Sequence, residues 1–163
     1  MKRKRFRLPR FGLGVAAMFA LASPVQAFQR VEFSQNVEVE TVTTGAAGQR
    51  KISFSAPETV VPGDRLRFTL QLDNQTSESA AGLKFVNPIP PEVRFASTDD
   101  MAGFSVSIDG GKTYGTLAGL TVPVAGAAAR PATADDVTHV QWVLPEPLAA
   151  GAVKKVTFFG IVR

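Results

Sequence analysis

Few side chains in this chain could carry out chemistry, and its single histidine, His139, is the first to consider. A serine hydrolase holds its histidine between a nucleophilic hydroxyl and an acidic side chain. His139 lies in the alternating segment THVQWVL, residues 138–144, on the face opposite Val140 and Trp142. The chain has no Gly-x-Ser-x-Gly motif, and one imidazole cannot build a zinc site of several histidines. We therefore expect His139 to face solvent or lie at a rim, and we predict no catalytic residue and no enzymatic activity.

Acidic side chains form the second candidate site, because exported β-sandwich proteins can bind calcium in their loops. The available carboxylates are those of Asp99, Asp100, Asp109, Asp135 and Asp136. None of them has the alternating spacing of an EF-hand loop. Aspartates also form turns and add surface charge, so calcium binding by these loops stays open. We predict no metal-binding or cofactor-binding residue.

The stretch SIDGGKTY, residues 107–114, has the spacing Ser-x-Asp-x-Gly-x-Thr-aromatic, which matches the Asp-box of sialidases and related β-propellers. A propeller needs several four-stranded blades, and this chain is too short to supply them. Sialidase chemistry also needs a tyrosine nucleophile, and the only tyrosine, Tyr114, belongs to the motif itself. The stretch therefore predicts a tight hairpin turn rather than a glycan-cleaving site.

Two further residues have both a binding and a structural interpretation. Trp142 could stack against a sugar ring, but its alternation with Val140 and Leu144 favours a buried tryptophan of a sandwich. The triplet Asn74-Gln75-Thr76 matches a glycosylation acceptor and equally fits a turn at the end of a strand.

The elements that must position these residues are almost all strands, because apolar side chains alternate with a period of two. The clearest example is RLRFTLQLD, residues 65–73, where Leu66, Phe68, Leu70 and Leu72 share one face. Similar patterns occur in FSVSI, THVQWVL and VKKVTFFGIV, and shorter candidates are RKISFS, GLKFV, EVRFA, GLTVPV and a strand within residues 29–43. Seven to nine short strands separated by turn residues predict an all-β antiparallel β-sandwich; a closed barrel is the alternative.

Two segments have more than one possible structure. Residues 125–136, AGAAARPATADD, are interrupted by Gly126 and Pro131, and we predict a long surface loop there. The segment VTFFGIV near the C-terminus is either a covered core strand or an exposed edge strand that binds another chain, and we favour the covered strand.

The N-terminus predicts export. Six basic residues precede an apolar run at residues 11–22, and small residues at Val25 and Ala27 predict signal-peptide cleavage after Ala27. The run is too short to span a bilayer, so we expect no transmembrane anchor after cleavage. Removal of residues 1–27 leaves 12 basic and 14 acidic residues, and a net charge of −2 gives no reason to expect nucleic-acid binding. The chain has no cysteine, which excludes thiol catalysis and disulfides.

The stretches ETVVPGDRLRFTLQLDNQ and LKFVNPIPPEVRFAS, with the later DVTHVQWVLPEPLAAG, resemble the bacterial domain-of-unknown-function-11 family. The similarity covers residues 57–163 and includes the Pro62-Gly63-Asp64 turn and the NPIP motif of residues 87–90. The resemblance implies an immunoglobulin-like sandwich in an exported, often envelope-associated protein, and it implies no catalytic residues. Family members commonly occur as tandem repeats, whereas this chain carries a single copy.

These observations predict a signal peptide at residues 1–27, an N-terminal strand region at residues 28–56 of the same domain, and an immunoglobulin-like sandwich at residues 57–163. We expect an exported, non-enzymatic module in the periplasm or at the cell surface, whose partner is an envelope or surface protein or a second copy of the chain. The alternative is a periplasmic ligand-binding module for carbohydrate or calcium.

Overall fold

The computed structural model describes residues 30–163, so the predicted export signal at residues 1–27 lies outside the described residues. The described part is all-β and has ten strands and two short 3-10 helices. In chain order they are β1 (Val31–Thr44), β2 (Arg50–Ser55), β3 (Arg65–Asn74), β4 (Lys84–Pro88), β5 (Val93–Thr98), β6 (Phe104–Ser107), η1 (Leu117–Gly119), β7 (Thr121–Val124), β8 (Ala127–Pro131), η2 (Ala134–Asp136), β9 (His139–Val143) and β10 (Val153–Val162).

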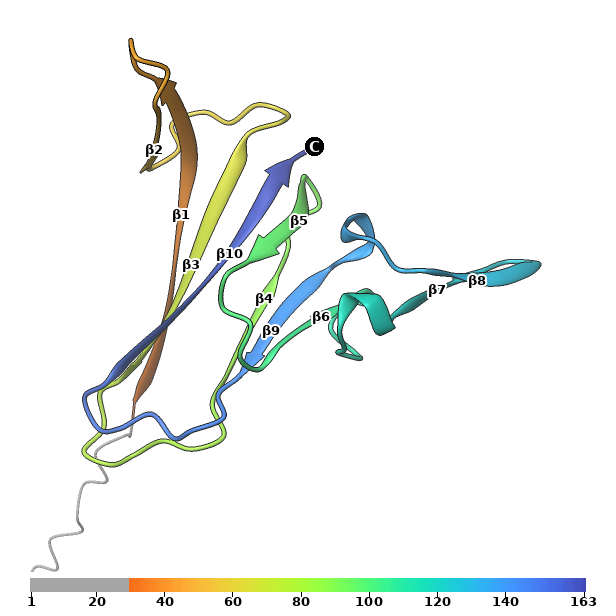
Figure 1. Ribbon diagram of the computed structural model, residues 1–163. Helices are drawn as coiled ribbons and strands as arrows, with labels where there is room; N and C mark the ends of the chain where they lie inside the picture. Colours follow the sequence, from red (N-terminus) through yellow and green to blue (C-terminus); the bar gives the residue numbers. More distant parts are fainter. Residues whose placement is uncertain (1–29) are drawn as a thin grey trace, which may run out of the picture.

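The strands form two main antiparallel sheets that pack against each other, as the sequence predicted (Figure 1). The larger sheet has the order β2-β1-β3-β10-β5, and the smaller one has the order β4-β9-β6. A separate hairpin of β7 and β8 projects from the side of the molecule. No helix in residues 30–163 is long and apolar enough to cross a membrane.

The core lies between the sheets and follows from the alternation of apolar side chains. In β3, the buried side chains are those of Leu66, Phe68, Leu70 and Leu72, which confirms the predicted inner face. Rings from both sheets meet in the centre: Phe68 stacks on Phe158 at 4.5 Å, and Trp142 lies 6.2 Å from Phe158 between ring centroids. Trp142 is fully buried, so the prediction of a core tryptophan is confirmed.

The last strand, β10, lies in the middle of the larger sheet, between β3 and β5. The hypothesis that VTFFGIV forms an exposed edge is therefore wrong, and the favoured prediction of a covered strand is confirmed. The ends of this sheet are β2 and β5. A strand with apolar and aromatic residues on both faces gains most when neighbouring strands satisfy both of its backbone edges.

Residues 125–136 are not one long loop, so that prediction is wrong. They contain β8, which pairs with β7 through a tight turn at Ala125 and Gly126, and the short helix η2. Gly126 adopts a positive φ of 71°, which the turn requires and glycine readily accepts. All side chains of β8 are exposed, so its sequence does not alternate between apolar and polar residues. β8 is also the strand that raises the count from the predicted maximum of nine to ten.

Strand β1 has two halves with different neighbours. Its first half, from Val31 to Val39, pairs with β3, and its second half, from Val39 to Thr44, pairs with β2. The β1–β2 hairpin therefore extends past the start of β3 and lies at one end of the larger sheet, clear of the smaller sheet (Figure 1). This arrangement exposes most of β2.

Candidate functional site

The SIDGGKTY stretch folds as a compact turn around the carboxylate of Asp109. The Ser107 hydroxyl lies 2.7 Å from Oδ1, the Thr113 hydroxyl donates to Oδ2 at 2.7 Å, and the backbone N–H groups of Lys112 and Thr113 donate to Oδ1. Hydrogen bonds from the hydroxyl and the amide of Thr113, and from the Ser107 hydroxyl, hold the pKa of Asp109 well below its usual range. The carboxylate oxygens accept hydrogen bonds from protein donors within the turn, so the predicted tight turn is confirmed.

His139 lies beside this turn as the cross-strand neighbour of Ser107. Its Nδ1 is 3.1 Å from the Thr138 hydroxyl, whereas the Ser107 hydroxyl hydrogen-bonds to Asp109. A catalytic serine–histidine pair would need a hydrogen bond between the Ser107 hydroxyl and the His139 imidazole. The half-buried His139 fits the predicted rim position, and the serine beside it belongs to the turn.

The first acidic pair, Asp99 and Asp100, is divided by its surroundings. The Asp100 carboxylate accepts a hydrogen bond from the backbone N–H of Thr157 at 2.7 Å. The Asp100 carbonyl accepts the indole N–H of Trp142 at 2.6 Å. Asp100 therefore connects the two sheets and has a structural role, whereas Asp99 is exposed.

The second acidic pair faces arginines. Asp135 lies 3.3 Å from Arg163 and 3.7 Å from Arg94, and Asp136 receives two hydrogen bonds from Arg130 at 2.6 and 2.7 Å. The bonds from Arg130 hold the pKa of Asp136 well below its usual range. Four of the five candidate carboxylates thus have protein partners at separate places in the fold, and the fifth, Asp99, is exposed. Within residues 30–163, no group of three or more metal-ligating side chains gathers.

Asn74, the first residue of the glycosylation triplet, is completely buried. Its side-chain N–H groups donate to the carbonyls of Glu78, Leu148 and Ala149 at 2.8–3.0 Å, and its side-chain oxygen accepts from the Thr76 hydroxyl at 2.7 Å. The amide links the β3–β4 and β9–β10 connections, which the Ala80–Leu148 backbone bridge also joins. The turn interpretation of the triplet is confirmed, because the amide nitrogen is not accessible in the fold.

The outer face of the larger sheet carries a group of side chains that the sequence did not bring together. We call Phe54, Arg65, Arg67 and Phe159 the arginine–phenylalanine cluster. The Arg67 guanidinium carbon lies 3.7 Å from the centre of the Phe54 ring, and that of Arg65 lies 4.4 Å from the centre of Phe159. The two rings are 6.4 Å apart. Cation–π stacking of this kind holds a ring in place on an exposed face.

Two glutamates of β1 fix the arginines of this cluster. Glu38 accepts from Nε and Nη2 of Arg67 at 3.0 and 2.7 Å, and Glu40 lies 3.2 Å from Nε of Arg65. Each guanidinium thus has an opposite charge and an aromatic ring as neighbours. The cluster is a pre-ordered surface with balanced charge.

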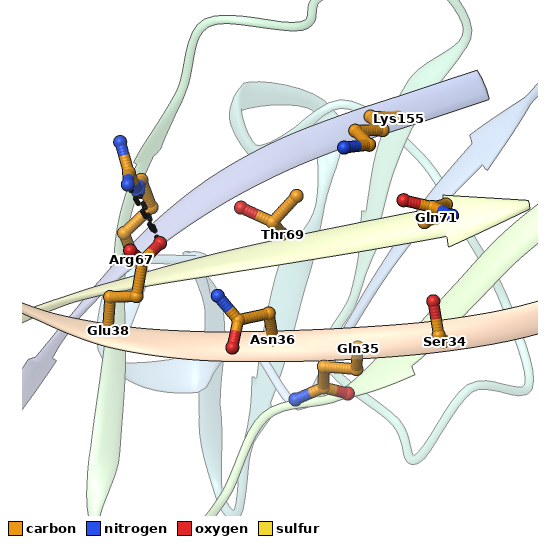
Figure 2. Close-up of a pocket in the computed structure, with 8 residues that line it drawn as sticks. All are labelled: Ser34, Gln35, Asn36, Glu38, Arg67, Thr69, Gln71 and Lys155. Carbon is orange, nitrogen blue, oxygen red and sulfur yellow. Dashed lines mark hydrogen bonds and ion pairs between the residues drawn. The ribbon is translucent and has the colours of Figure 1, made fainter. Parts of the chain in front are cut away.

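Beside the cluster, the same face is hollowed into a polar depression of about 410 Å³. Figure 2 shows amides, hydroxyls and one ammonium group along β1, β3 and β10, with the Arg67–Glu38 pair at one end. It is lined by Ser34, Gln35, Asn36, Glu38, Arg67, Thr69, Gln71 and Lys155.

The β2 edge is the third feature of this region. The backbone N–H of Gly45 donates to the carbonyl of Gln49, and the Ser53 hydroxyl lies 3.4 Å from the carbonyl of Thr41. Hydrogen-bonded pairs alternate along an antiparallel ladder, so the odd-numbered residues of β2 point their backbone groups toward β1. The backbone groups of Arg50, Ile52 and Phe54 therefore point away from the sheet. No other strand of the described residues pairs with this edge.

The side chains at this edge are also exposed. Ile52 is 54% exposed and its neighbour on β1, Val42, is 41% exposed. Both lie on the outer face, next to Phe54 of the cluster. An apolar edge with unpaired backbone groups can bind a further strand.

Comparison of the chain with protein-family models, curated proteins and solved structures found no significant match. The resemblance of residues 57–163 to the domain-of-unknown-function-11 family stays a prediction, and so does the division at residue 57.

Proposed function

We propose that this protein is an exported, non-enzymatic β-sandwich module of the bacterial envelope that acts through structural or protein–protein contacts. The observation that carries the proposal is the β2 edge, where the backbone groups of Arg50, Ile52 and Phe54 point outward beside exposed apolar side chains. The partner adds a strand to this edge, and backbone hydrogen bonds supply much of the affinity. The rigid arginine–phenylalanine cluster supplies side-chain specificity next to it.

The export part of this proposal rests on the sequence of residues 1–27. A basic start, a short apolar run and small residues before the expected cleavage position are typical of secretory signals. The site of action is accordingly the periplasm or the cell surface.

A crosslinked pull-down from envelope fractions tests the proposal with two proline variants. Ile52→Pro removes an outward N–H that makes no bond within the sheet, so it blocks an added strand and leaves the β1–β2 ladder intact. Val86→Pro is the matched control, because Val86 is also exposed and lies on β4, an edge of the smaller sheet.

We expect the wild type and Val86→Pro to recover the same identified protein, or the chain itself as an oligomer, and Ile52→Pro to lose it. Recovery of neither from wild type would refute the interaction function. Equal recovery by folded Ile52→Pro would refute the β2 edge as the contact.

Carbohydrate binding is the second candidate function, and the polar depression favours it. Its amides and hydroxyls, which include those of Asn36, Thr69 and Gln71, offer hydrogen-bond donors and acceptors of the kind that sugar hydroxyls use. Binding of a glycan from a panel should raise the melting temperature of wild type, and Asn36→Ala with Gln71→Ala should remove that rise. Gln75→Ala, which changes an exposed amide outside the depression, should keep it. A panel without any shift in wild type would eliminate this candidate.

A further inference from the structure

The β2 edge is self-complementary, and we propose that its partner is a second copy of this chain, paired β2 to β2 in an antiparallel sheet. This inference rests on the proposed function of the edge and names the occupant. The two-fold axis passes at Ile52, so that Ile52 lies opposite Ile52 of the second copy. The larger sheets of both molecules then join into one continuous sheet.

The direction of the backbone groups selects this register. Arg50, Ile52 and Phe54 are the residues whose N–H and C=O groups point outward. With Ile52 on the axis, Arg50 lies opposite Phe54 of the second copy, and all outward groups find a partner. If one β2 strand were shifted by a single residue, inward-pointing backbone groups would lie opposite outward-pointing ones. The only alternative registers are therefore those shifted by two residues.

The side chains distinguish the remaining registers. In the proposed register Lys51 faces Ser53 of the second copy, so the lysines of β2 do not oppose each other. A shift in one direction places Lys51 against Lys51 of the second copy, and like charges directly opposite are unfavourable. A shift by two residues in the other direction leaves the backbone groups of Arg50 without a partner within β2 of the second copy, because that strand ends at Ser55.

The pairs formed in the proposed register are favourable ones. The two Ile52 side chains, each 54% exposed in the single molecule, cover each other. Arg50 comes to lie beside Phe54 of the second copy, whose ring already stacks with Arg67 on one face. A second guanidinium near the same ring repeats the cation–π contact that the cluster uses within one molecule.

The opposite end of the larger sheet does not offer the same opportunity. Strand β5, at that end, is flanked by η2, where Asp135 lies 3.7 Å from Arg94. Pairing of the β2 edge with itself about a two-fold axis uses the same edge of both molecules, so it gives a closed dimer rather than a filament. The β1–β2 hairpin lies at one end of the molecule, away from the smaller sheet (Figure 1).

Cysteine crosslinking tests the register directly, because the chain has no cysteine of its own. Residues in a hydrogen-bonded antiparallel pair have Cα atoms about 5.5 Å apart, a distance that a disulfide spans. We expect Ile52→Cys in the full chain to form a disulfide dimer under mild oxidation. Ser53→Cys is the matched control, because its neighbour across the axis is Lys51 and its side chain lies on the other face, and we expect it to stay monomeric.

Sedimentation across a concentration series provides the second measurement. Wild type should be dimeric at high concentration, and Ile52→Pro should raise the dimer dissociation constant roughly tenfold or more. Crosslinking of Ser53→Cys instead of Ile52→Cys would overturn the register, and a wild type that is monomeric throughout would overturn the dimer. In that last case, recovery of a different envelope protein that depends on Ile52 would leave the proposed function standing.

Discussion

Replacing Asn74 with alanine should destabilise this protein far more than replacing another buried asparagine. Asn74 is fully buried and donates to the carbonyls of Glu78, Leu148 and Ala149. These carbonyls belong to the connections that close one end of the sandwich. Without the amide, both connections lose these side-chain bonds, and only the backbone bonds of Asn74 with Gly151 and Ala152 still hold the β9–β10 connection to the end of β3.

The expected magnitude follows from these bonds. Each of the carbonyls also accepts a second donor, such as the backbone N–H of Ala80 at Leu148, so none is left without a partner. The amide has two N–H groups, which these three carbonyls share, and its oxygen accepts from the Thr76 hydroxyl, so about three bonds are lost. At a net value of about 1 kcal/mol per bond, the total loss is about 3 kcal/mol. For a chain of this length, that lowers the melting temperature by roughly 12 °C.

Thermal unfolding followed by circular dichroism measures this effect, and Asn87→Ala is its control. Asn87 is also buried, but its side chain makes one hydrogen bond, to the Pro88 carbonyl at 2.9 Å, so we expect a loss of about 1 kcal/mol. Asn74→Asp adds a second test. Its buried carboxylate would face carbonyl oxygens, so its pKa should be raised in the folded state and the variant should regain stability as the pH falls. Equal melting temperatures for Asn74→Ala and Asn87→Ala would refute the role of Asn74.

The remaining predictions concern the Asp109 turn and the core tryptophan. Because the pKa of Asp109 is lowered in the folded state, its carboxylate stabilises the fold above about pH 4, and this stabilisation is lost as the pH falls further. The difference in melting temperature between wild type and Asp109→Asn should therefore shrink in acid, and a difference that is constant from pH 7 to pH 2 would contradict this. Gly110→Val and Gly111→Val should each lower the free energy of unfolding by at least about 1 kcal/mol, because both glycines have positive φ. The loss should be larger for Gly111→Val, because of the two positions only Gly111 has side chains within contact distance of an added Cβ. Equal losses in urea unfolding would argue against that packing. Trp142→Phe should lose about 1–3 kcal/mol, because the Asp100 carbonyl loses its indole donor; a loss below that range by chemical denaturation would show that this bond is not important.

The sequence predicted the strands well because alternation records which side of a strand is buried. It predicted the inner face of β3, the burial of Trp142 and the turn at Asp109, each from residues close together in the chain. These features depend on local spacing, which a single sequence displays.

The candidate site could not be predicted in the same way, because it depends on strand order and register. Phe54 and Phe159 are far apart in the sequence, and they meet only because β1 and β3 lie between β2 and β10. The open edge at β2 is likewise a property of strand order. Strand β8 was not predicted for a different reason, since a strand exposed on both faces has no apolar period to detect.

Residue-resolved hydrogen exchange at β2 is the most direct test of the central claim, that the β2 edge is the contact surface. In dilute wild-type protein, the amides of Ile52 and Phe54 should exchange fast, whereas those of Lys51 and Ser53 should be protected by β1. When the partner or a second copy binds, the Ile52 and Phe54 amides should become protected. If a complex forms while these amides keep exchanging fast, the contact surface lies elsewhere and the account is wrong.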